Sequence, residues 1–229
     1  SGSGRGLTGR NMRVRVNTAR GRKSSSTRWL DRQLNDPYVH EAQKKGYRSR
    51  AAFKLLQLDE KYGFLRSGQR VVDLGAAPGG WTQVAVDRVR PDGKKSRVVA
   101  VDLQEMEPIL GADILCMDFT NNAAPARLNE LLGGPANLVL SDMAARVTGH
   151  KSTDHLRTTA LCELAHAFAV GSLAPGGTLV MKTFAGGAQG ELMAAIKVDF
   201  EKVRTVKPAA SRAESPETYI VAIGFRGDL

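Results

Sequence analysis

Beyond Gly68 the hydrophobic positions fall into short runs that alternate with helical patterns. Seven apolar, largely β-branched runs predict strands at Arg70–Leu74, Arg97–Leu103, Ala112–Met117, Asn137–Ser141, Thr178–Lys182, Phe200–Val206 and Glu217–Ile223. Apolar residues at helical spacing predict helices at Gly80–Arg90, Ala124–Leu132, Asp154–Ser172 and Gln189–Lys197. Strands that alternate with helices predict an α/β fold with a doubly wound, mostly parallel seven-stranded sheet and helices on both faces.

The last two strand-like runs depart from this alternation. The segment between them, Pro208–Pro216, has the composition of a loop and no helical pattern. We therefore expect the two runs to pair as an antiparallel hairpin at the sheet edge, as in class I (Rossmann-like) methyltransferases.

Two further helices are predicted upstream of the sheet. One of about ten residues starts near Ser26 and stops before Pro37, because the residue preceding a proline avoids the α region. The other covers Ser49–Leu58. Its apolar residues, including Phe53, mark a buried side, so we expect Lys54 near the edge of that side.

The formal net charge of +10 belongs entirely to the start of the chain. Of the 33 basic and 23 acidic residues, 13 and 3 lie in residues 1–50, which leaves 20 of each in residues 51–229. Residues 1–28 are predicted to form a disordered basic arm, of which Ser1–Gly4 is a linker or expression remnant, and residues 29–229 a single domain. A neutral body with a basic arm favours a polyphosphate partner such as RNA; a solvated tail without a partner is the alternative.

Cysteine usage and hydropathy bear on the compartment. Cys116 and Cys162 lie in apolar stretches and are interpreted as core residues, and no Cys/His pair has metal-ligand spacing. No stretch approaches the roughly 20 apolar residues of a membrane span. We expect a cytoplasmic monomer that binds no metal or membrane. The Arg- and Ser-rich start also resembles a mitochondrial transit peptide, but its apolar residues alternate instead of forming a helical face.

The first predicted strand ends in a small-residue turn of the kind that binds nucleotide cofactors. The turn, Gly75-Ala76-Ala77-Pro78-Gly79-Gly80, follows Asp73 and precedes a helix that begins with Trp81. Its Gly-x-x-x-Gly-Gly spacing differs from the Gly-x-Gly-x-x-Gly of dinucleotide sites, and no phosphate-binding Lys-Ser/Thr pair follows. A ligand with an amino group and a ribose, such as S-adenosylmethionine, fits this turn better than one carrying phosphates. An ordinary Gly-rich turn is the alternative.

Acidic residues end the next three predicted strands. Asp102 lies at the end of the second strand, and Asp118 and Asp142 directly follow the third and fourth. In such a sheet the ligand lies at the carboxyl ends of the strands, so Asp102 is placed to bind a ribose and Asp118 to lie at an adenine edge. Each Asp could instead cap a turn, but three at consecutive strand ends favour a ligand site.

The same edge of the sheet offers groups for a reaction. A sugar hydroxyl is a poor methyl acceptor and needs a base, and the candidates are Asp142, Lys182 and Glu217. Lys182 follows three apolar residues, so it is either a functional amine or a side chain that extends to the surface. Burial and a neighbouring Lys54 disfavour a charged amine, whereas the two carboxylates favour it, so the four groups would share their protons.

An ordered set of motifs resembles the FtsJ/RrmJ (RlmE-like) family of ribosomal RNA large-subunit ribose 2′-O-methyltransferases. The motifs are Arg48–Lys54, Asp73–Trp81, Val101–Leu103, Met117–Phe119, Leu140–Ala144, Val180–Lys182, Ser211-Arg212 and Glu217–Val221. The resemblance implies a catalytic Lys-Asp-Lys-Glu tetrad at Lys54, Asp142, Lys182 and Glu217, with Lys182 as the base. It also implies that S-adenosylmethionine is bound by Asp73, the Gly75–Trp81 loop, Asp102, Leu103, Asp118, Phe119 and Asp142.

The resemblance further implies a substrate. Family members of this branch methylate a uridine in the A loop of large-subunit ribosomal RNA, usually within the assembled particle. Transfer RNA or a messenger RNA cap is the alternative substrate, and a ribosome-assembly factor without turnover is the alternative class. The absent Gly-x-Gly-x-x-Gly pattern disfavours a nicotinamide oxidoreductase.

Overall fold

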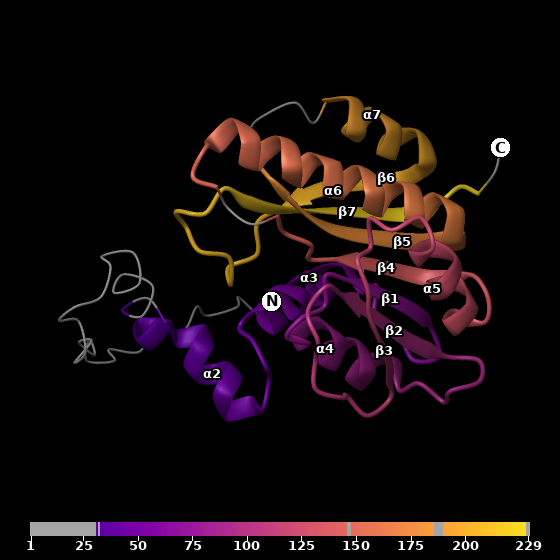
Figure 1. Cartoon of the computed structure of the whole chain (residues 1–229), viewed down its shortest axis with the longest axis horizontal. Helices are drawn as coiled ribbons and strands as arrows, with labels where there is room; N and C mark the ends of the chain where they lie inside the picture. The colour runs from indigo at the N-terminus through magenta and orange to yellow at the C-terminus, as the bar shows by residue number, and fades with distance from the viewer. Residues whose placement is uncertain (1–30, 32, 146–147, 186–189, 228–229) are drawn as a thin grey trace.

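The fold is built on one seven-stranded sheet. The computed structural model describes residue 31 and residues 33–145, 148–185 and 190–227. The strands are β1 (Arg70–Leu74), β2 (Arg97–Asp102), β3 (Ala112–Cys116), β4 (Ala136–Ser141), β5 (Leu173–Phe184), β6 (Phe200–Val206) and β7 (Glu217–Phe225). Their order is β3-β2-β1-β4-β5-β7-β6, as Figure 1 shows.

The predicted doubly wound topology and the hairpin are confirmed. β1 to β5 run parallel, and β7 is antiparallel to both of its neighbours, β5 and β6. The outermost strand on this side is β6, and β7 lies between it and β5. β7 therefore starts at the edge where the parallel strands end.

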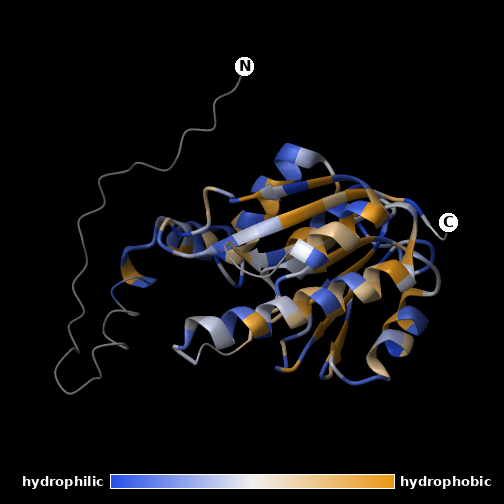
Figure 2. Ribbon diagram, turned by 90° about the horizontal axis from the view of Figure 1, so that it is seen from above, coloured by the Kyte–Doolittle hydropathy of each residue, from blue (hydrophilic) through white to orange (hydrophobic). Residues whose placement is uncertain are grey.

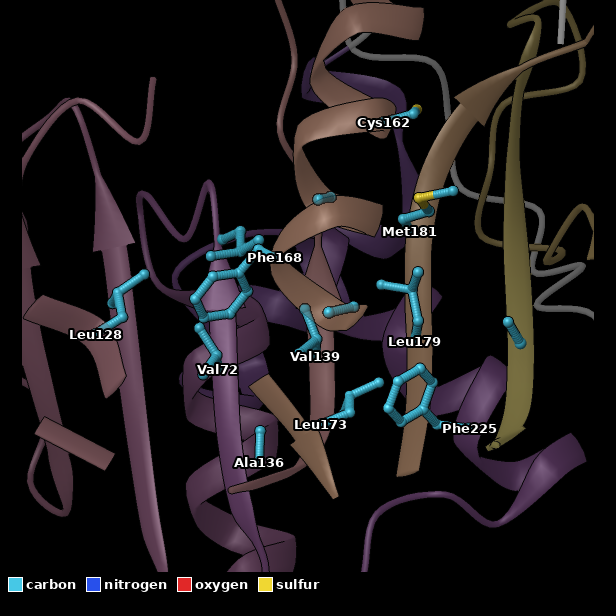
Figure 3. Packing of buried hydrophobic residues seen from close by; sticks show 14 of the residues in the cluster. Val72, Leu128, Ala136, Val139, Cys162, Phe168, Leu173, Leu179, Met181 and Phe225 are labelled. Carbon is cyan, nitrogen blue, oxygen red and sulfur yellow. The ribbon is translucent and has the colours of Figure 1, made fainter. Parts of the chain in front are cut away.

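Helices cover both faces of the sheet (Figure 1). α3 (Ala51–Tyr62) and α4 (Gly80–Val89) pack on one face, and α5 (Ala124–Leu132), α6 (Lys151–Ser172) and α7 (Gly190–Asp199) on the other. Figure 2 shows that the strands are largely hydrophobic, whereas hydrophilic and hydrophobic residues alternate along the helices. In Figure 3, Phe168 of α6 and Leu128 of α5 pack against Val72 and Val139 of the sheet. This burial of apolar area is the main source of stability for such a layered fold.

One helix was not predicted. Residues 31 and 33–35 are helical and Asp36 is extended, so the predicted stop before Pro37 is correct where the structure describes it. The same proline, however, starts α2 (Pro37–Lys45), and the Asp36 side chain caps it by accepting a bond from the Tyr38 N–H at 3.0 Å. Proline fits the first turn of a helix because the N–H that it lacks has no helical partner there. α2 packs on α3 rather than on the sheet.

Other differences concern boundaries and one cysteine. α3 and β5 extend beyond their predicted ends, while β2 and β3 each stop one residue early. Cys162 is buried as predicted, but the prediction for Cys116 is wrong, since its side chain is exposed on β3. β3 is an outermost strand, and the helices cover it incompletely. The basic arm, the start of the first helix and Gln189 lie outside the described residues.

None of the described helices is long and apolar enough to cross a membrane. Among the described residues there is also no group of three or more His, Cys, Asp or Glu side chains that could hold a metal ion.

Candidate active site

The four residues of the predicted tetrad meet at the carboxyl edge of the parallel strands. Asp142 directly follows β4, Lys182 lies near the end of β5, and Glu217 begins β7. The antiparallel register pairs Lys182 with Tyr219 and Phe184 with Glu217, which brings the last of these motifs beside the end of β5. Lys54 enters from α3, which covers this face of the sheet.

The tetrad forms two lysine–carboxylate pairs. The Nζ of Lys54 lies 2.7 Å from Oε1 of Glu217, and the Nζ of Lys182 lies 3.2 Å from Oδ1 of Asp142. Lys182 also donates to the backbone carbonyl of Asp142 at 2.8 Å. Lys54 was expected near the edge of the buried side of its helix, but its side chain is only 11% exposed and reaches inward. Both lysine side chains are thus held by carboxylates within the site instead of extending into solvent.

Burial and charge act in opposite directions on Glu217. Burial alone would raise the pKa of this carboxyl, but the charge and hydrogen bond of Lys54 outweigh it and hold the pKa below its ordinary value. The Ser211 hydroxyl donates to the same oxygen at 2.8 Å and acts in the same direction. Glu217 is therefore a carboxylate that fixes the Lys54 ammonium.

Tyr219 joins the two pairs, and sequence reasoning did not single it out. Its hydroxyl donates to Oδ1 of Asp142 at 3.1 Å and also faces Glu217. Burial, reinforced by these two carboxylates, raises the pKa of the phenol well above its ordinary value, so the hydroxyl remains a donor. Its ring lies 5.6 Å from that of Trp81. The signal available in the sequence was its position two residues after Glu217 in the same predicted strand, which places both side chains on one face.

The glycine loop bends sharply beside Asp142. Gly75 has φ +73°, and a Cβ there would come within 2.7 Å of the Met143 Cα, so no other residue fits without a shift of the backbone. Gly79 has φ +113° and is the N-cap residue directly before α4. The Trp81 indole is buried and donates to the Ala51 carbonyl at 2.8 Å. The Trp81 side chain is therefore part of the core between α3, α4 and the sheet.

Asp73 lies buried beneath this loop. Thr82 donates to its Oδ2 at 2.7 Å, whereas its Oδ1 is buried without a hydrogen-bond partner among the described residues. Burial raises the pKa of Asp73 to about 7; Thr82 opposes this, and the negative charges of Asp142 and Asp102 add to it. This oxygen, next to the glycine loop, is available to a donor group on a bound ligand.

The next two acids combine turn capping with access to the strand ends. Asp102 accepts from the Ala77 N–H at 2.9 Å and from the Gln104 N–H at 2.8 Å. Asp118 accepts the Thr120 N–H and hydroxyl through a single oxygen, and these bonds lower its pKa. Capping therefore occurs at both residues. Of the remaining predicted cofactor contacts, Leu103 is exposed and Phe119 is buried against Phe168.

Two arginines lie beside the tetrad and share one carboxylate. Asp36 Oδ2 lies 3.0 Å from Nε of Arg50 and 3.2 Å from Nη2 of Arg212. Arg50 is one helical turn before Lys54, and Arg212 follows Ser211, which holds Glu217. Two guanidinium groups face one carboxylate, so this cluster has one unneutralised positive charge close to the Lys54–Glu217 pair.

Comparison with known proteins identifies the family of the chain. The FtsJ-like methyltransferase family matches residues 47–225. The chain belongs to this family. S-adenosylmethionine is accordingly its methyl donor, and the FtsJ-like domain contains both the glycine loop and the tetrad.

Similar FtsJ-like proteins carry a common name. Proteins of Cereibacter sphaeroides and Ruegeria pomeroyi are each 59% identical over 230 residues, which is 98% of this chain and 93% and 98% of theirs. Both are named ribosomal RNA large subunit methyltransferase E. A solved structure from Plasmodium falciparum, described as that of a ribosomal RNA methyltransferase, is 31% identical with a TM-score of 0.69, covering 80% of this chain and 100% of that one.

Proposed function

We propose that this FtsJ-like methyltransferase methylates a ribose 2′-hydroxyl of large-subunit ribosomal RNA. The target we propose is a uridine of the A loop within the ribosomal subunit. The observation that carries the proposal is the pair of lysine–carboxylate contacts, Lys54–Glu217 and Lys182–Asp142, at the carboxyl edge of the sheet. Methyl transfer to a more nucleophilic acceptor would need no such base.

The residues at the strand ends fit S-adenosylmethionine. The unpartnered Oδ1 of Asp73 suits a donor such as the amino group, and Asp102 suits the ribose hydroxyls. Asp118 retains one carboxylate oxygen for the adenine edge, with the Phe119 backbone beside it. The turn from Gly75 to Gly80 offers a backbone that a ligand can approach without a Cβ in its way. Bound there, S-adenosylmethionine would supply an electrophilic methyl group.

The tetrad supplies the base and the electrostatic setting. Lys182, in its neutral form, accepts the proton of the 2′-hydroxyl at Nζ, and Asp142 and Tyr219 orient that amine through the contacts described above. Lys54, fixed by Glu217, presents a positive charge that stabilises the negative charge that develops on the 2′-oxygen. Base catalysis of this kind contributes roughly 10²- to 10⁴-fold.

The substrate assignment has two supports. The names of the relatives indicate large-subunit ribosomal RNA. The surplus charge of Arg50 and Arg212 lies close to the tetrad and suits a backbone phosphate next to the target ribose.

The direct test is Lys182→Ala, assayed with radiolabelled S-adenosylmethionine and ribosomal subunits. We expect a loss of methyl incorporation of at least ~100-fold with unchanged binding of S-adenosylhomocysteine. Lys202→Ala, at an exposed position on β6, is the matched control and should behave as the wild type. Near-normal incorporation by Lys182→Ala would remove this residue from the mechanism. Mapping alkali-resistant linkages in the product identifies the nucleotide, and modification of transfer RNA or a cap instead would refute the substrate.

A further inference from the structure

The Arg48-Ser49-Arg50 segment before α3 sends its three side chains in different directions. Arg50 turns toward Asp36 and the Ala210 carbonyl, on the side of the tetrad. Ser49 lies against the start of α4, where a Cβ on Gly80 would come within 2.6 Å of its Oγ. Arg48 turns toward the glycine loop and the loop after β2. Two arginines in one basic motif therefore have different surroundings.

Arg48 joins two loops that border the proposed cofactor site. Its Nη1 donates to the carbonyls of Glu107 at 2.6 Å and Pro78 at 3.4 Å, and its Nη2 donates to the Pro108 carbonyl at 2.8 Å. Pro78 belongs to the glycine loop, and the other two residues belong to the loop at 103–111. A planar guanidinium holds its N–H donors in a fixed fork and can therefore bond carbonyls of two loops at once. A lysine ammonium is a compact point charge and does not offer this spread of donors.

The position of the guanidinium is fixed from both ends. The Arg48 N–H donates to Oε1 of Gln83 on α4 at 2.8 Å, and Nε2 of the same glutamine donates to the Gly46 carbonyl at 3.0 Å. A Cβ on Gly79 would lie 3.3 Å from the Arg48 side chain and 2.8 Å from Cδ1 of Ile109. The two loops and the arginine are therefore in close contact at Gly79.

The loop at 103–111 needs such a support. It contains no helix or strand, and most of its residues are exposed, Leu110 to 97%. It follows Asp102, whose carboxylate accepts one bond from the glycine loop at Ala77 and one from Gln104 at its own start. Its middle, at Glu107 and Pro108, is held by Arg48. Release of this loop would loosen the wall next to the ribose-binding acid.

We infer that Arg48 is a positioning residue for S-adenosylmethionine, which fastens the loop at 103–111 to the glycine loop, and that it is not an RNA contact. The inference rests on the proposed cofactor site at Gly75–Trp81 and Asp102. Because a guanidinium that is occupied by three carbonyls has little capacity left for a phosphate, Arg48 acts on cofactor affinity and not on the salt dependence of RNA binding.

The test compares Arg48→Met and Arg48→Lys with the wild type and with Arg204→Met, a control on the exposed face of β6. For Arg48→Met we expect a Kd for S-adenosylhomocysteine and a KM for S-adenosylmethionine raised roughly tenfold or more, the effect of one lost charge-assisted hydrogen bond. The kcat at saturating cofactor, the KM for RNA and its salt dependence should stay within about twofold. Hydrogen exchange should accelerate at residues 103–111 and not in the β4–β5 core. Arg48→Lys should fall between the two.

Two results would overturn the inference. One is normal cofactor binding with a raised KM for RNA and a flatter salt dependence, which would make Arg48 a phosphate contact. The other is faster exchange throughout the domain in both Arg48 variants, which would make it a general fold contact. The variant Asp102→Asn distinguishes failure of the Arg48 inference from failure of the proposed cofactor site. If Asp102→Asn weakens S-adenosylhomocysteine binding and Arg48→Met does not, the site stands and the inference fails. If Asp102→Asn has no effect, the proposed site itself fails.

Discussion

At the scale of single residues, Tyr219 bears on how the proposed base, Lys182, is held in position. Lys182 and Tyr219 are opposite each other on neighbouring strands, and both contact Oδ1 of Asp142. One carboxylate oxygen is thus contacted by both the Lys182 amine and the Tyr219 hydroxyl. Since the phenol is fully buried, its hydroxyl has no access to solvent as an alternative partner.

Tyr219→Phe should therefore impair methyl transfer without loss of fold. The ring can still pack on Trp81, but Asp142 loses one of the donors that fix it, and the Lys182 amine becomes less well oriented. We expect kcat to fall about tenfold, as for one hydrogen bond to a charged group, with the Kd of S-adenosylhomocysteine unchanged. Single-turnover kinetics measure this. Tyr62→Phe at the end of α3 is the control, and equal rates for the two variants would contradict the role of Tyr219.

Asp73 links stability to pH at this site. Its pKa is raised to about 7 in the folded protein from an ordinary value of 3.8. Between these values the folded state holds a proton that the unfolded state has released, so stability falls as pH rises from about 4 to 7. Asp73→Asn removes this dependence. The variant should be more stable than the wild type between pH 5 and 8. The difference in unfolding free energy is at most ~4 kcal/mol, at about 1.36 kcal/mol per pKa unit. Urea unfolding at several pH values measures it, and parallel pH profiles for the two proteins would disprove it.

The identities of the tetrad residues could be predicted from the sequence, but their pairing could not. The motifs mark Lys54, Asp142, Lys182 and Glu217, and a common strand edge follows from the α/β alternation. Which lysine meets which carboxylate depends on the β5–β7 register and on the depth at which α3 lies on the sheet. A shift of one residue in that register would turn Tyr219 to the opposite face, and no local pattern specifies it.

At the scale of elements, the ends of β1 and β4 approach each other at Gly75. The Asp142 N–H donates to the Leu74 carbonyl at 3.0 Å, and Met143 lies directly over the glycine. The position of Asp142, and through it that of Lys182, therefore depends on an unobstructed turn after β1.

Gly75→Ala should disturb both stability and catalysis. The positive φ alone costs about 1–3 kcal/mol for a residue with a Cβ, and the 2.7 Å approach to the Met143 Cα requires a backbone shift in addition. We expect a lower unfolding midpoint and a loss of methyl transfer larger than the stability change explains. Gly171→Ala is the matched control, because its site in α6 is exposed with no atom within 4 Å, and it should stabilise by roughly 0.5–1 kcal/mol. Full activity of Gly75→Ala would refute the argument.

Local sequence patterns predicted most helices and strands. They failed where the same residue or run is compatible with two structural environments. Pro37 ends one helix and begins the next, and only the Asp36 cap and the packing of α2 on α3 decide the second use. Cys116 follows an apolar run, yet that run forms an edge strand, and a sequence does not state which strand is outermost. Both errors arise from tertiary position, which overrides local preference.

At the scale of the whole molecule, charge is distributed in two unequal parts. The excess of ten basic residues lies within residues 1–50, and residues 5–25 alone contain seven arginines and lysines and no acid. Residues 51–229 are neutral overall, and Arg50, at the end of the basic part, combines with Arg212 to give a local surplus near the tetrad. Recognition of RNA would then combine a short-range contact at the site with a diffuse attraction from the arm.

Removal of residues 5–25 tests this division. Because counterion release scales with the phosphates neutralised, the slope of log affinity against log salt should decrease by up to about 6 for seven cations, at ~0.9 per contact. RNA affinity should fall most at low salt, whereas the Kd of S-adenosylhomocysteine should not change, since the proposed cofactor contacts all come from residues 73–142. Filter binding between 50 and 300 mM salt gives the slope.

The choice of control decides what that experiment means. A variant of full length with the seven arginines and lysines replaced by glutamine keeps the length of the arm and removes only its charge. If it reproduces the deletion, the arm acts by electrostatic attraction and speeds association, an effect that added salt suppresses. If it binds with the wild-type slope while the deletion does not, the arm contributes contacts other than charge. An unchanged slope in both proteins would make the arm a passive tail, and the Arg50–Arg212 cluster would then have to account for the electrostatic part of RNA binding.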